Sequence, residues 1–338
     1  MDTTLVSNIR TVLSGAKAPE DFGWGPNDVA AWKELVRGDP VAFMTLGVWS
    51  RRVKEVDPVT GEDRPAVHPL VPFIPWKAQA EMIYSMVSAV ESGQDIAVAK
   101  SRETGVSVIS TAISVWGWLF HKWDVLLCSR TEALVDRSGD PDTLFAKVEH
   151  VLKYLPPQWL PCPLQDLQAG GRRRRHCILE HPDGNAITGE ATTSHIGRGA
   201  RKTVVVFDEA ASQDRFESGW RSAADTAASR WAVSTHLVGS YFTNTLWETA
   251  KTTESPIPVL LTYVDDPQKS AGGSWTIDPD GSITGDPGRS YYWSPWLEMQ
   301  RKRRDVHDLR ENVLALPSSQ GRGFFPVVDT ERQRQHIQ

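Results

Sequence analysis

Short apolar runs recur along the central part of the sequence. Most are four to six residues long and rich in β-branched side chains, which is typical of strands buried on both faces of a sheet. Stretches with apolar residues at helical spacing lie between them. The expected strands cover residues 96–99, 125–129, 204–207, 232–235 and 259–264. Strands that alternate with helices in this way predict an α/β domain with a mainly parallel sheet.

The helical stretches have apolar positions three or four residues apart. Prolines mark the approach to the second of them, and a proline-marked break follows the fourth. The expected helices cover residues 28–37, 77–90, 107–120, 141–155 and 294–312.

Two turn motifs predict β-hairpins. His-Pro-Asp-Gly-Asn separates residues 177–180 from 186–188, and Asp-Pro-Asp-Gly separates 275–277 from 282–284. Asp-Gly and Gly-Asn pairs favour the left-handed backbone that tight hairpin turns require. We therefore expect two hairpins inserted into the α/β framework.

Composition excludes several classes of protein. The 338 residues carry 37 basic and 42 acidic side chains, so the net charge of −5 excludes a protein that coats nucleic acid through bulk charge. Three cysteines without Cys-x-x-Cys spacing favour a reducing compartment and argue against a structural zinc site. The longest uncharged run, residues 104–120, is shorter than the ~20 residues that span a bilayer. No secretory signal is visible at the N-terminus.

A phosphate-binding loop is the first candidate site. Ile-Ala-Val-Ala-Lys-Ser-Arg-Glu-Thr-Gly-Val-Ser runs from an expected strand through a turn into a helix, whose N-terminus favours anions. Gly105 and Ser107 fit the pattern Gly-x4-Gly-Lys-Ser/Thr, but Lys100 replaces its first glycine and Val106 its lysine. Lys100 and Arg102 are expected to supply the missing charge from the start of the loop. The alternative is that both are ordinary charges on a solvated loop.

A second signal is the pair of acids that ends an apolar strand. Asp208 and Glu209 follow Val-Val-Val-Phe, and a buried parallel strand delivers its last residues to the ligand-binding edge of a sheet. Asp208 is suited to hold Mg²⁺, and Glu209 to orient and deprotonate an attacking water. Two acids can also simply end a strand. Together with the loop, the pair predicts a nucleoside triphosphatase.

At these motifs the sequence resembles the large terminase subunits of tailed double-stranded DNA bacteriophages, over about residues 65–330. Pro-Trp-Lys-Ala-Gln79 resembles the glutamine motif on the adenine side, and Lys100 to Ser107 resembles the deviant loop of members whose lysine begins the loop. Residues 188–199, followed by Val-Val-Val-Phe-Asp-Glu-Ala-Ala, are similar to the segment that enters the acidic strand. The order of these motifs carries the resemblance.

Ser234 and Thr235 resemble the motif that couples hydrolysis to movement. The usual Thr-Pro-x-Gly is not matched, because His236 and Leu237 follow Thr235.

The resemblance implies a site for ATP and Mg²⁺. Glu209, Lys100 and Arg102 are its expected catalytic residues, and Ser107 and Asp208 its expected metal ligands. The expected nucleotide-binding residues are Gln79, Lys100, Ser101, Arg102, Glu103, Thr104, Gly105, Val106 and Ser107.

Basic residues outside the loop are candidates for contacts with DNA or a neighbouring subunit. Arg130 and Arg137 follow the second strand, where an arginine finger acting in trans is possible. For every one of these residues, an ordinary solvated surface is the alternative. The candidate DNA contacts are Arg172, Arg173, Arg174, Arg175, Arg198, Arg201 and Lys202.

The implied fold is a RecA-like, ASCE-type P-loop ATPase with a mainly parallel central sheet flanked by helices and β-hairpin insertions. Residues 1–65 would form a peripheral or lid segment and 66–265 the ATPase core. Residues 266–316 would form a small C-terminal subdomain. Residues 317–338 would be a linker toward an absent nuclease domain, so nuclease activity is not expected.

The implied function is ATP-driven translocation of double-stranded DNA into a procapsid. The implied partners are duplex DNA, the portal protein, the small terminase subunit and further copies in a ring, with no membrane. The protein would lie in the host cytoplasm, transiently at the portal vertex, and not in the mature virion. The alternatives are a helicase-like ATPase that acts on nucleic acid and a non-catalytic nucleotide-binding assembly module.

Overall fold

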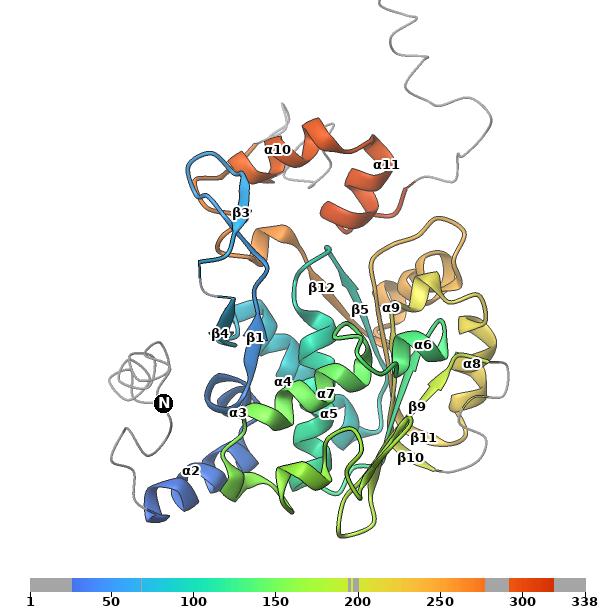
Figure 1. The fold of residues 1–338 in the computed structure, drawn as a ribbon. Coiled ribbons are helices and arrows are strands. Elements are labelled where there is room, and N and C mark those ends of the chain that lie inside the picture. Colours follow the sequence, from blue (N-terminus) through green and yellow to red (C-terminus); the bar gives the residue numbers. More distant parts are fainter. Residues whose placement is uncertain (1–25, 68, 194–195, 197–200, 277–291, 319–338) are drawn as a thin grey trace, which may run out of the picture.

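An eight-stranded sheet forms the centre of the computed structural model, which describes residues 26–67, 69–193, 196, 201–276 and 292–318 (Figure 1). Six neighbouring strands run parallel, and the last two at one edge pair antiparallel. The strands in spatial order are β12 (Ile257–Leu261), β5 (Ile96–Lys100), β11 (Ala227–Ser234), β10 (Lys202–Asp208), β6 (Val125–Ser129), β9 (Ala186–Ala191), β8 (Ile178–Glu180) and β7 (Arg174–Arg175).

The strand order confirms the expected fold class. Strand β11 lies between β5, which leads into the phosphate loop, and β10, which ends in the acidic pair. One such intervening strand is the arrangement expected of an ASCE-type P-loop fold. Every residue of β5 and β6 is buried, which explains why both strands are continuous apolar runs.

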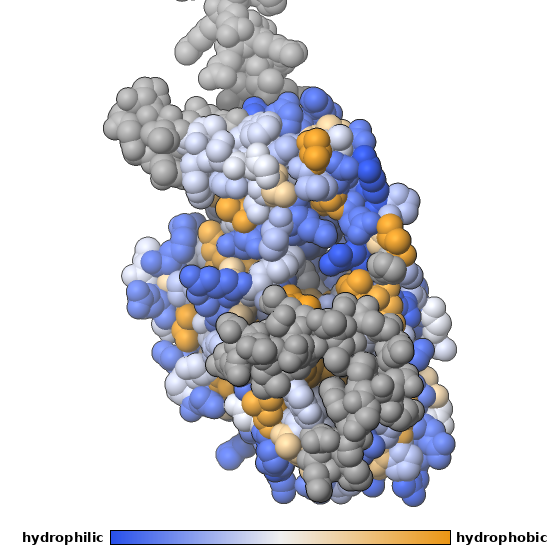
Figure 2. All heavy atoms as spheres, turned by 90° about the vertical axis from the view of Figure 1, so that its left-hand side faces the viewer, coloured by the Kyte–Doolittle hydropathy of each residue, from blue (hydrophilic) through white to orange (hydrophobic). Residues whose placement is uncertain are grey.

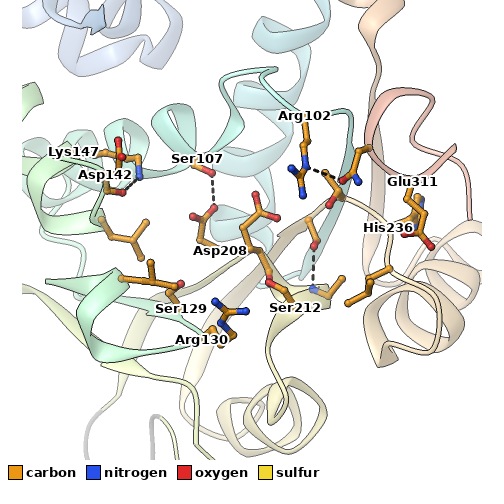
Figure 3. Close-up of a pocket in the computed structure, with 18 residues that line it drawn as sticks. Arg102, Ser107, Ser129, Arg130, Asp142, Lys147, Asp208, Ser212, His236 and Glu311 are labelled. Carbon is orange, nitrogen blue, oxygen red and sulfur yellow. Dashed lines mark hydrogen bonds between the residues drawn. The ribbon is translucent and has the colours of Figure 1, made fainter. Parts of the chain in front are cut away.

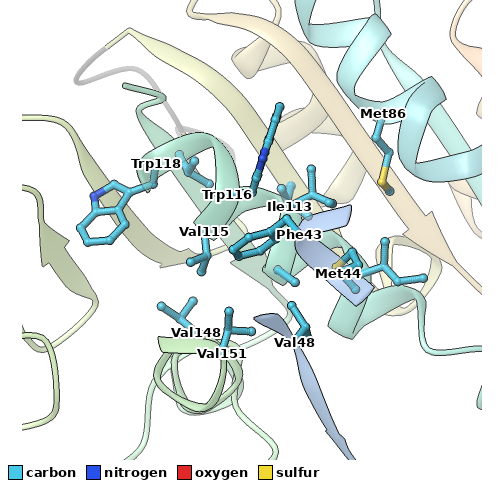
Figure 4. Packing of buried hydrophobic residues seen from close by; sticks show 14 of the residues in the cluster. Phe43, Met44, Val48, Met86, Ile113, Val115, Trp116, Trp118, Val148 and Val151 are labelled. Atoms are coloured by element: carbon cyan, nitrogen blue, oxygen red, sulfur yellow. The ribbon is translucent and has the colours of Figure 1, made fainter. Parts of the chain in front are cut away.

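Helices cover both faces of the sheet (Figure 1). On one face the apolar side chains of α3, α4, α5 and α7 form the main core, and Figure 4 shows Phe43 of α3 beside Val115 of α5 and close to Val148 and Val151 of α7. The other face packs against α8, η5 and α9 through a second cluster around Phe207 and Phe216. These helices are α3 (Pro40–Gly47), α4 (Lys77–Ser92), α5 (Val106–Phe120), α7 (Leu144–Tyr154), α8 (Phe216–Ala223), η5 (Phe242–Leu246) and α9 (Trp247–Thr253).

Part of the segment expected to be peripheral, residues 36–48, packs into this core, whereas residues 1–25 lie outside the described residues. Phe43 and Met44 are fully buried in the main cluster, and the indole Nε1 of Trp116 donates to the carbonyl of Val36 at 2.7 Å. The remaining elements of this part are α2 (Pro26–Gly38), β1 (Trp49–Arg51), β2 (Lys54–Val56), β3 (Asp63–Pro65) and β4 (Leu70–Pro72), with β1 paired to β4 and β2 to β3.

The first hairpin is confirmed and is longer than expected. Strands β8 and β9 pair antiparallel on either side of the His-Pro-Asp-Gly-Asn turn, and β7 adds a third strand. The strand expected at residues 259–264 instead ends at Leu261. Thr262 then caps the short turn η6 (Tyr263–Asp265). The other short elements are α6 (Glu132–Val135), η2 (Pro157–Trp159), η3 (Leu164–Asp166) and η4 (Ala210–Ser212).

The C-terminal subdomain lies beyond the carboxyl edge of the sheet (Figure 1) and differs from the expectation in two ways. Trp275 pairs with Tyr292 in the ribbon of β13 (Ser274–Trp275) and β14 (Tyr292–Trp293), while residues 282–284 lie outside the described residues. The single helix expected at 294–312 is broken. Arg304 is extended and the Asp305 carboxylate caps a new start. The resulting segments are α10 (Pro295–Arg303), α11 (Val306–Asp308) and η7 (Leu309–Val313).

The described surface is mainly hydrophilic, with small scattered apolar areas on the face that Figure 2 shows. Among the described residues, no helix combines the length and the apolar character needed to cross a bilayer.

A glycine inside α5 provides a stability prediction. A Cβ at Gly117 would lie 2.0 Å from a ring carbon of the buried Trp123. We therefore expect Gly117→Ala to lower the free energy of unfolding by roughly 1–3 kcal/mol. Helix propensity alone predicts a gain of about 1 kcal/mol. Urea unfolding measures the difference. The matched control is Gly38→Ala at the end of α2, where nothing lies within 4 Å. A stabilised Gly117→Ala protein would contradict the packing.

Candidate functional site

A cavity of about 530 Å³ lies at the carboxyl edge of the sheet, where the phosphate loop, the acidic strand and the expected coupling strand meet (Figure 3). Parallel strands β5, β11 and β10 bring their last residues to this edge. The cavity is lined by Arg102, Ser107, Ser129, Arg130, Leu134, Asp142, Leu144, Lys147, Asp208, Glu209, Ala211, Ser212, Ser234, Thr235, His236, Leu237, Glu311 and Asn312.

The two expected metal ligands lie in direct contact. The Ser107 hydroxyl at the start of α5 donates to Oδ1 of Asp208 at 2.6 Å (Figure 3). Burial, and then the neighbouring Glu209 carboxylate, raise the pKa of Asp208, while the Ser107 hydrogen bond opposes this. A hydroxyl and a buried carboxylate that share one edge of a cavity provide the oxygen ligands that Mg²⁺ prefers. The two residues therefore fit a magnesium ion.

Lys100 and Glu209 form the second contact of the site. The Lys100 ammonium donates to Oε1 of Glu209 at 2.9 Å, with a side-chain exposure of 6% for the lysine and 42% for the glutamate. Glu209 adopts a left-handed backbone with φ of 54°, which is uncommon for a residue with a side chain. Such outliers concentrate at functional sites. The lysine at the start of the loop thus reaches Glu209, the acid that directly follows β10.

The turn between β5 and α5 presents free backbone donors. Among the described residues, no protein acceptor takes the amide N–H groups of residues 103–107. Left-handed backbone at Glu103 and Gly105, with φ of 60° and 74°, shapes this turn. Consecutive free amides at a helix N-terminus form an anion-binding concavity. The backbone amides therefore form a candidate phosphate-binding site, although the lysine of the usual loop pattern is absent.

Gln79 of α4 is hydrogen-bonded to the phosphate loop. Its side-chain Nε2 donates to the carbonyl of Thr104 at 2.9 Å, and its Oε1 accepts the amide of Trp76 at 2.9 Å. Because Gln79 is buried and both ends of its amide are occupied, its hydrogen bonds fix the loop. A second cavity, of about 570 Å³, lies beside these residues and is also lined by Phe73 and Gly105.

Residues from the C-terminal subdomain complete the site, and sequence reasoning missed them. The Arg102 guanidinium Nε donates to Oδ1 of Asn312 at 2.9 Å, and the Arg102 amide donates to the Asn312 carbonyl at 2.8 Å. The buried Lys269 ammonium donates to the carbonyls of Arg102 and Glu103, both at 3.1 Å. Burial lowers the pKa of Lys269. These contacts join the loop to residues more than 160 positions away.

The loop that follows the expected coupling residues contacts the C-terminal subdomain. Ser234 Oγ accepts the amide of Ala211 at 3.0 Å, which ties the end of β11 to the turn after the acidic pair. Two residues past His236, the amide of Val238 donates to Oε1 of the buried Glu311 at 3.0 Å. Glu311 and Asn312 are neighbours, so one short segment touches both the phosphate loop and the coupling loop.

Lys147 of α7 is a further cation in the cavity that the motifs did not indicate. It donates to the carbonyl of Asp142, and its charge favours the ionised form of Asp208. The helical periodicity of α7 predicted the helix but gave no signal that this position faces the site.

The two candidate arginine fingers lie in different places. Arg130 is exposed and lines the candidate site of its own chain. Arg137 lies outside that cavity and pairs with Asp140 at 2.5 Å.

The arginine run is not a uniform surface patch. Arg174 is buried, pairs with Asp136 at 2.9 Å and with Glu149 at 2.8 Å, and packs over Phe145, so it is not available to DNA, and the expectation for this residue is wrong. Strand β7 alternates inward and outward, which places Arg174 inside.

The neighbouring arginines keep an exposed or half-buried position. Arg172 and Arg175 are exposed and paired with Asp166 and Glu180, and Arg173 is half-buried. In the last group of candidate DNA contacts, Arg201 is exposed, Lys202 is half-buried and Arg198 lies outside the described residues.

His236 provides a pH prediction. Burial lowers its pKa from 6.5 to about 4, with the rings of Phe242 and Trp247 about 6 Å away. Between these two pH values the unfolded chain binds a proton that the folded chain does not, so the free energy of unfolding falls as pH falls from 6.5 to 4, by up to about 3 kcal/mol. We expect His236→Phe to remove this part of the slope in urea unfolding measured across that range. Equal slopes in both proteins would contradict it.

Comparison with known proteins finds similarity only in structure. No family model and no curated protein matches the sequence. A large terminase structure from a thermophilic bacteriophage has 12% identity and a TM-score of 0.43, over 72% of this chain and 53% of that one. The complex of that terminase with ADP has 13% identity and a TM-score of 0.45, with the same coverage. The large terminase of bacteriophage HK97 has 12% identity and a TM-score of 0.45, over 83% of this chain and 55% of that one. The chain is thus similar in structure to these large terminases and spans about half of their length.

Proposed function

We propose that this chain binds and hydrolyses ATP, as the motor part of a large terminase that translocates double-stranded DNA. The observation that carries the proposal is the paired contact at the sheet edge, Ser107 with Asp208 and Lys100 with Glu209. Free amides at residues 103–107 support it, because phosphoryl transfer depends mainly on positioning and charge neutralisation.

The phosphates of ATP would lie on the amides of the loop. Its adenine ring would extend toward the second cavity, beside Gln79 and Trp76. Ser107 and Asp208 would hold Mg²⁺, which neutralises phosphate charge when bound. Glu209 would orient the attacking water and accept its proton, and Arg102 would face the terminal phosphate. Arg102, Ser107, Asp208 and Glu209 line the first cavity, and residues 103–105 of the loop line the second cavity with Trp76 and Gln79.

Lys100 would change partner during the cycle. In this structure its ammonium is held by Glu209 at 2.9 Å. A phosphate seated on the loop amides would compete for the same ammonium, because the lysine is buried and adjoins the loop. Once the ammonium donated its hydrogen bond to a phosphate oxygen, the Glu209 carboxylate would be free to accept a hydrogen bond from the attacking water. One contact would thereby link nucleotide binding to activation of the base.

Translocation would use the connection from the site to the C-terminal subdomain. Ser234 and Thr235 would respond to loss of the terminal phosphate, and Glu311 and Asn312 of η7 would carry the change into the C-terminal subdomain. Grip on duplex DNA would use phosphate contacts, because a packaging motor must move any sequence. We further propose that copies of the chain form a ring at the portal of a procapsid in the host cytoplasm, with a small terminase subunit delivering the DNA.

The test is ATP hydrolysis by the purified chain, measured alone, with duplex DNA, and with duplex DNA and procapsids. We expect hydrolysis that requires Mg²⁺ and rises with DNA. Strand separation by the chain would favour the helicase-like alternative. Nucleotide binding without hydrolysis in all three conditions would favour the assembly module and would contradict the motor.

A further inference from the structure

A second cluster of metal-ligating side chains lies outside the candidate site. Glu132 belongs to α6, and His176 and Cys177 form the turn between β7 and β8. One ligand atom from each residue lies within 4.8 Å of the other two. His176 Nε2 is 2.8 Å from Oε1 of Glu132 and 3.7 Å from Sγ of Cys177. The fold thus brings together three donors that are not spaced as a motif in the sequence.

These distances approach those of a tetrahedral zinc site. Zinc bonds of about 2.1 Å to nitrogen or oxygen and about 2.3 Å to sulfur place N and O about 3.4 Å apart and N and S about 3.6 Å apart. The separation between His176 and Cys177 already matches. The carboxylate of Glu132 would move outward by about half an ångström, and its side chain is 65% exposed and free to do so.

The other ring nitrogen of His176 faces a carboxylate. Nδ1 lies 3.4 Å from Oδ2 of Asp136, and Asp136 is itself held by Arg174 at 2.9 Å and by the amide of Cys177 at 2.7 Å. A histidine that binds zinc almost always donates its second N–H to a carboxylate, a backbone carbonyl or a water, which fixes the ring and its tautomer. The Asp136 carboxylate, which forms an ion pair with this nitrogen, lies in the position of such an acceptor.

The backbone also directs the thiol. Cys177 has a left-handed backbone with φ of 55°. Two hydrogen bonds hold it: the Cys177 amide donates to Asp136, and the Gly189 amide donates to the Cys177 carbonyl at 2.9 Å. A residue with a side chain rarely adopts this conformation unless its surroundings impose it. Here the conformation places Sγ beside His176.

We propose that Glu132, His176 and Cys177 bind a divalent transition metal of the zinc type, with a water in the fourth position. Nitrogen and sulfur donors favour zinc over Mg²⁺ or Ca²⁺, which prefer oxygen. The cation joins α6 to the turn between β7 and β8. Leu134 of α6 lines the candidate site, so the metal stabilises one wall of that site.

The test measures metal on the full chain, prepared without a histidine tag and stripped with a chelator. After dialysis against Zn²⁺ without nucleotide, we expect one zinc more per wild-type chain than per Cys177→Ser or His176→Ala chain. Apparent affinity should fall at least tenfold in both variants. Cys162→Ser removes a different partly buried thiol and should retain the zinc. Equal zinc content in the wild-type and Cys177→Ser proteins would overturn the proposal.

Co²⁺ supplies a readout that identifies the ligand. Cobalt bound to a thiolate absorbs in the near ultraviolet by charge transfer, and we expect this absorption in the wild-type and Cys162→Ser proteins. Its absence in the wild type, or its persistence in Cys177→Ser, would overturn the site. Glu132→Gln alters only an exposed side chain, so it keeps the test decisive if Cys177→Ser fails to fold. Glu132→Gln should weaken cobalt binding, but the charge-transfer absorption should still be present when cobalt saturates the site. Because no nucleotide is used, the result is independent of the proposed ATPase.

Discussion

Glu209→Gln is expected to reduce ATP turnover by at least about a hundredfold, while the affinity for nucleotide changes less than about threefold. A general base contributes roughly 10²–10⁴-fold to a rate. Glutamine keeps the shape of the side chain and accepts the Lys100 hydrogen bond, but it cannot take the proton from water. The side chain is 42% exposed at the cavity, so the substitution leaves the core intact.

The measurement is steady-state ATP hydrolysis together with equilibrium binding of a fluorescent ATP analogue. Glu217→Gln is the matched control, because Glu217 is exposed on α8 and pairs with Arg221 one turn along the same helix. Hydrolysis by Glu209→Gln within threefold of the wild type would remove Glu209 from the role of base. A parallel loss of binding would instead indicate a structural role for its contact with Lys100.

The centre of the sheet was predictable from the sequence because β5, β6 and most of β10 and β11 are buried on both faces. A continuous apolar run such as the one before Asp208 is typical of a parallel strand that is buried on both faces. The topology rule also accounts for the contact between Ser107 and Asp208, since the loop after β5 and the end of β10 lie at one edge of the sheet. The prediction of the sheet needed only local pattern and this rule.

The break within the last helix was not predictable from periodicity. Residues 294–312 keep a helical pattern, yet Asp305 accepts the amides of His307 and Asp308 and so begins a new segment. An aspartate in a helical stretch is compatible with either a cap or an exposed position. Trp296 and Leu309, on either side of the break, lie in one buried apolar cluster of the C-terminal subdomain, and this packing decides between them.

The residues that complete the site carry no local signal. Lys269, Glu311 and Asn312 reach the loop or the coupling segment only because the C-terminal subdomain folds over the sheet edge. Asn312 is itself held by Asp308, whose carboxylate accepts its Nδ2–H at 2.6 Å. Such contacts depend on tertiary packing across more than seventy residues, which spacing in the sequence does not encode.

Lys100→Ala is expected to lower kcat/KM for ATP hydrolysis at least tenfold, which corresponds to about 1.4 kcal/mol. A buried charge-assisted hydrogen bond contributes about 1.5–3 kcal/mol, and contacts to developing charge contribute more in the transition state. The structure strengthens this expectation because Lys100 is 5% exposed and already lies 2.9 Å from the proposed base. Val106, at the usual position of the lysine, is 1% exposed in the main core and has no charge to offer.

Lys100→Met separates charge from packing, since it keeps the length of the buried stem and removes the ammonium. We expect it to lose activity as Lys100→Ala does, whereas Lys153→Ala, on the exposed side of α7, should stay within twofold of the wild type. The measurement is kcat/KM with saturating Mg²⁺, with urea unfolding to confirm that each protein is folded. If Lys100→Met retained activity and only Lys100→Ala lost it, the lysine would act by filling space. The ammonium would then have no role at the phosphates, and the loop would depend on its backbone amides alone.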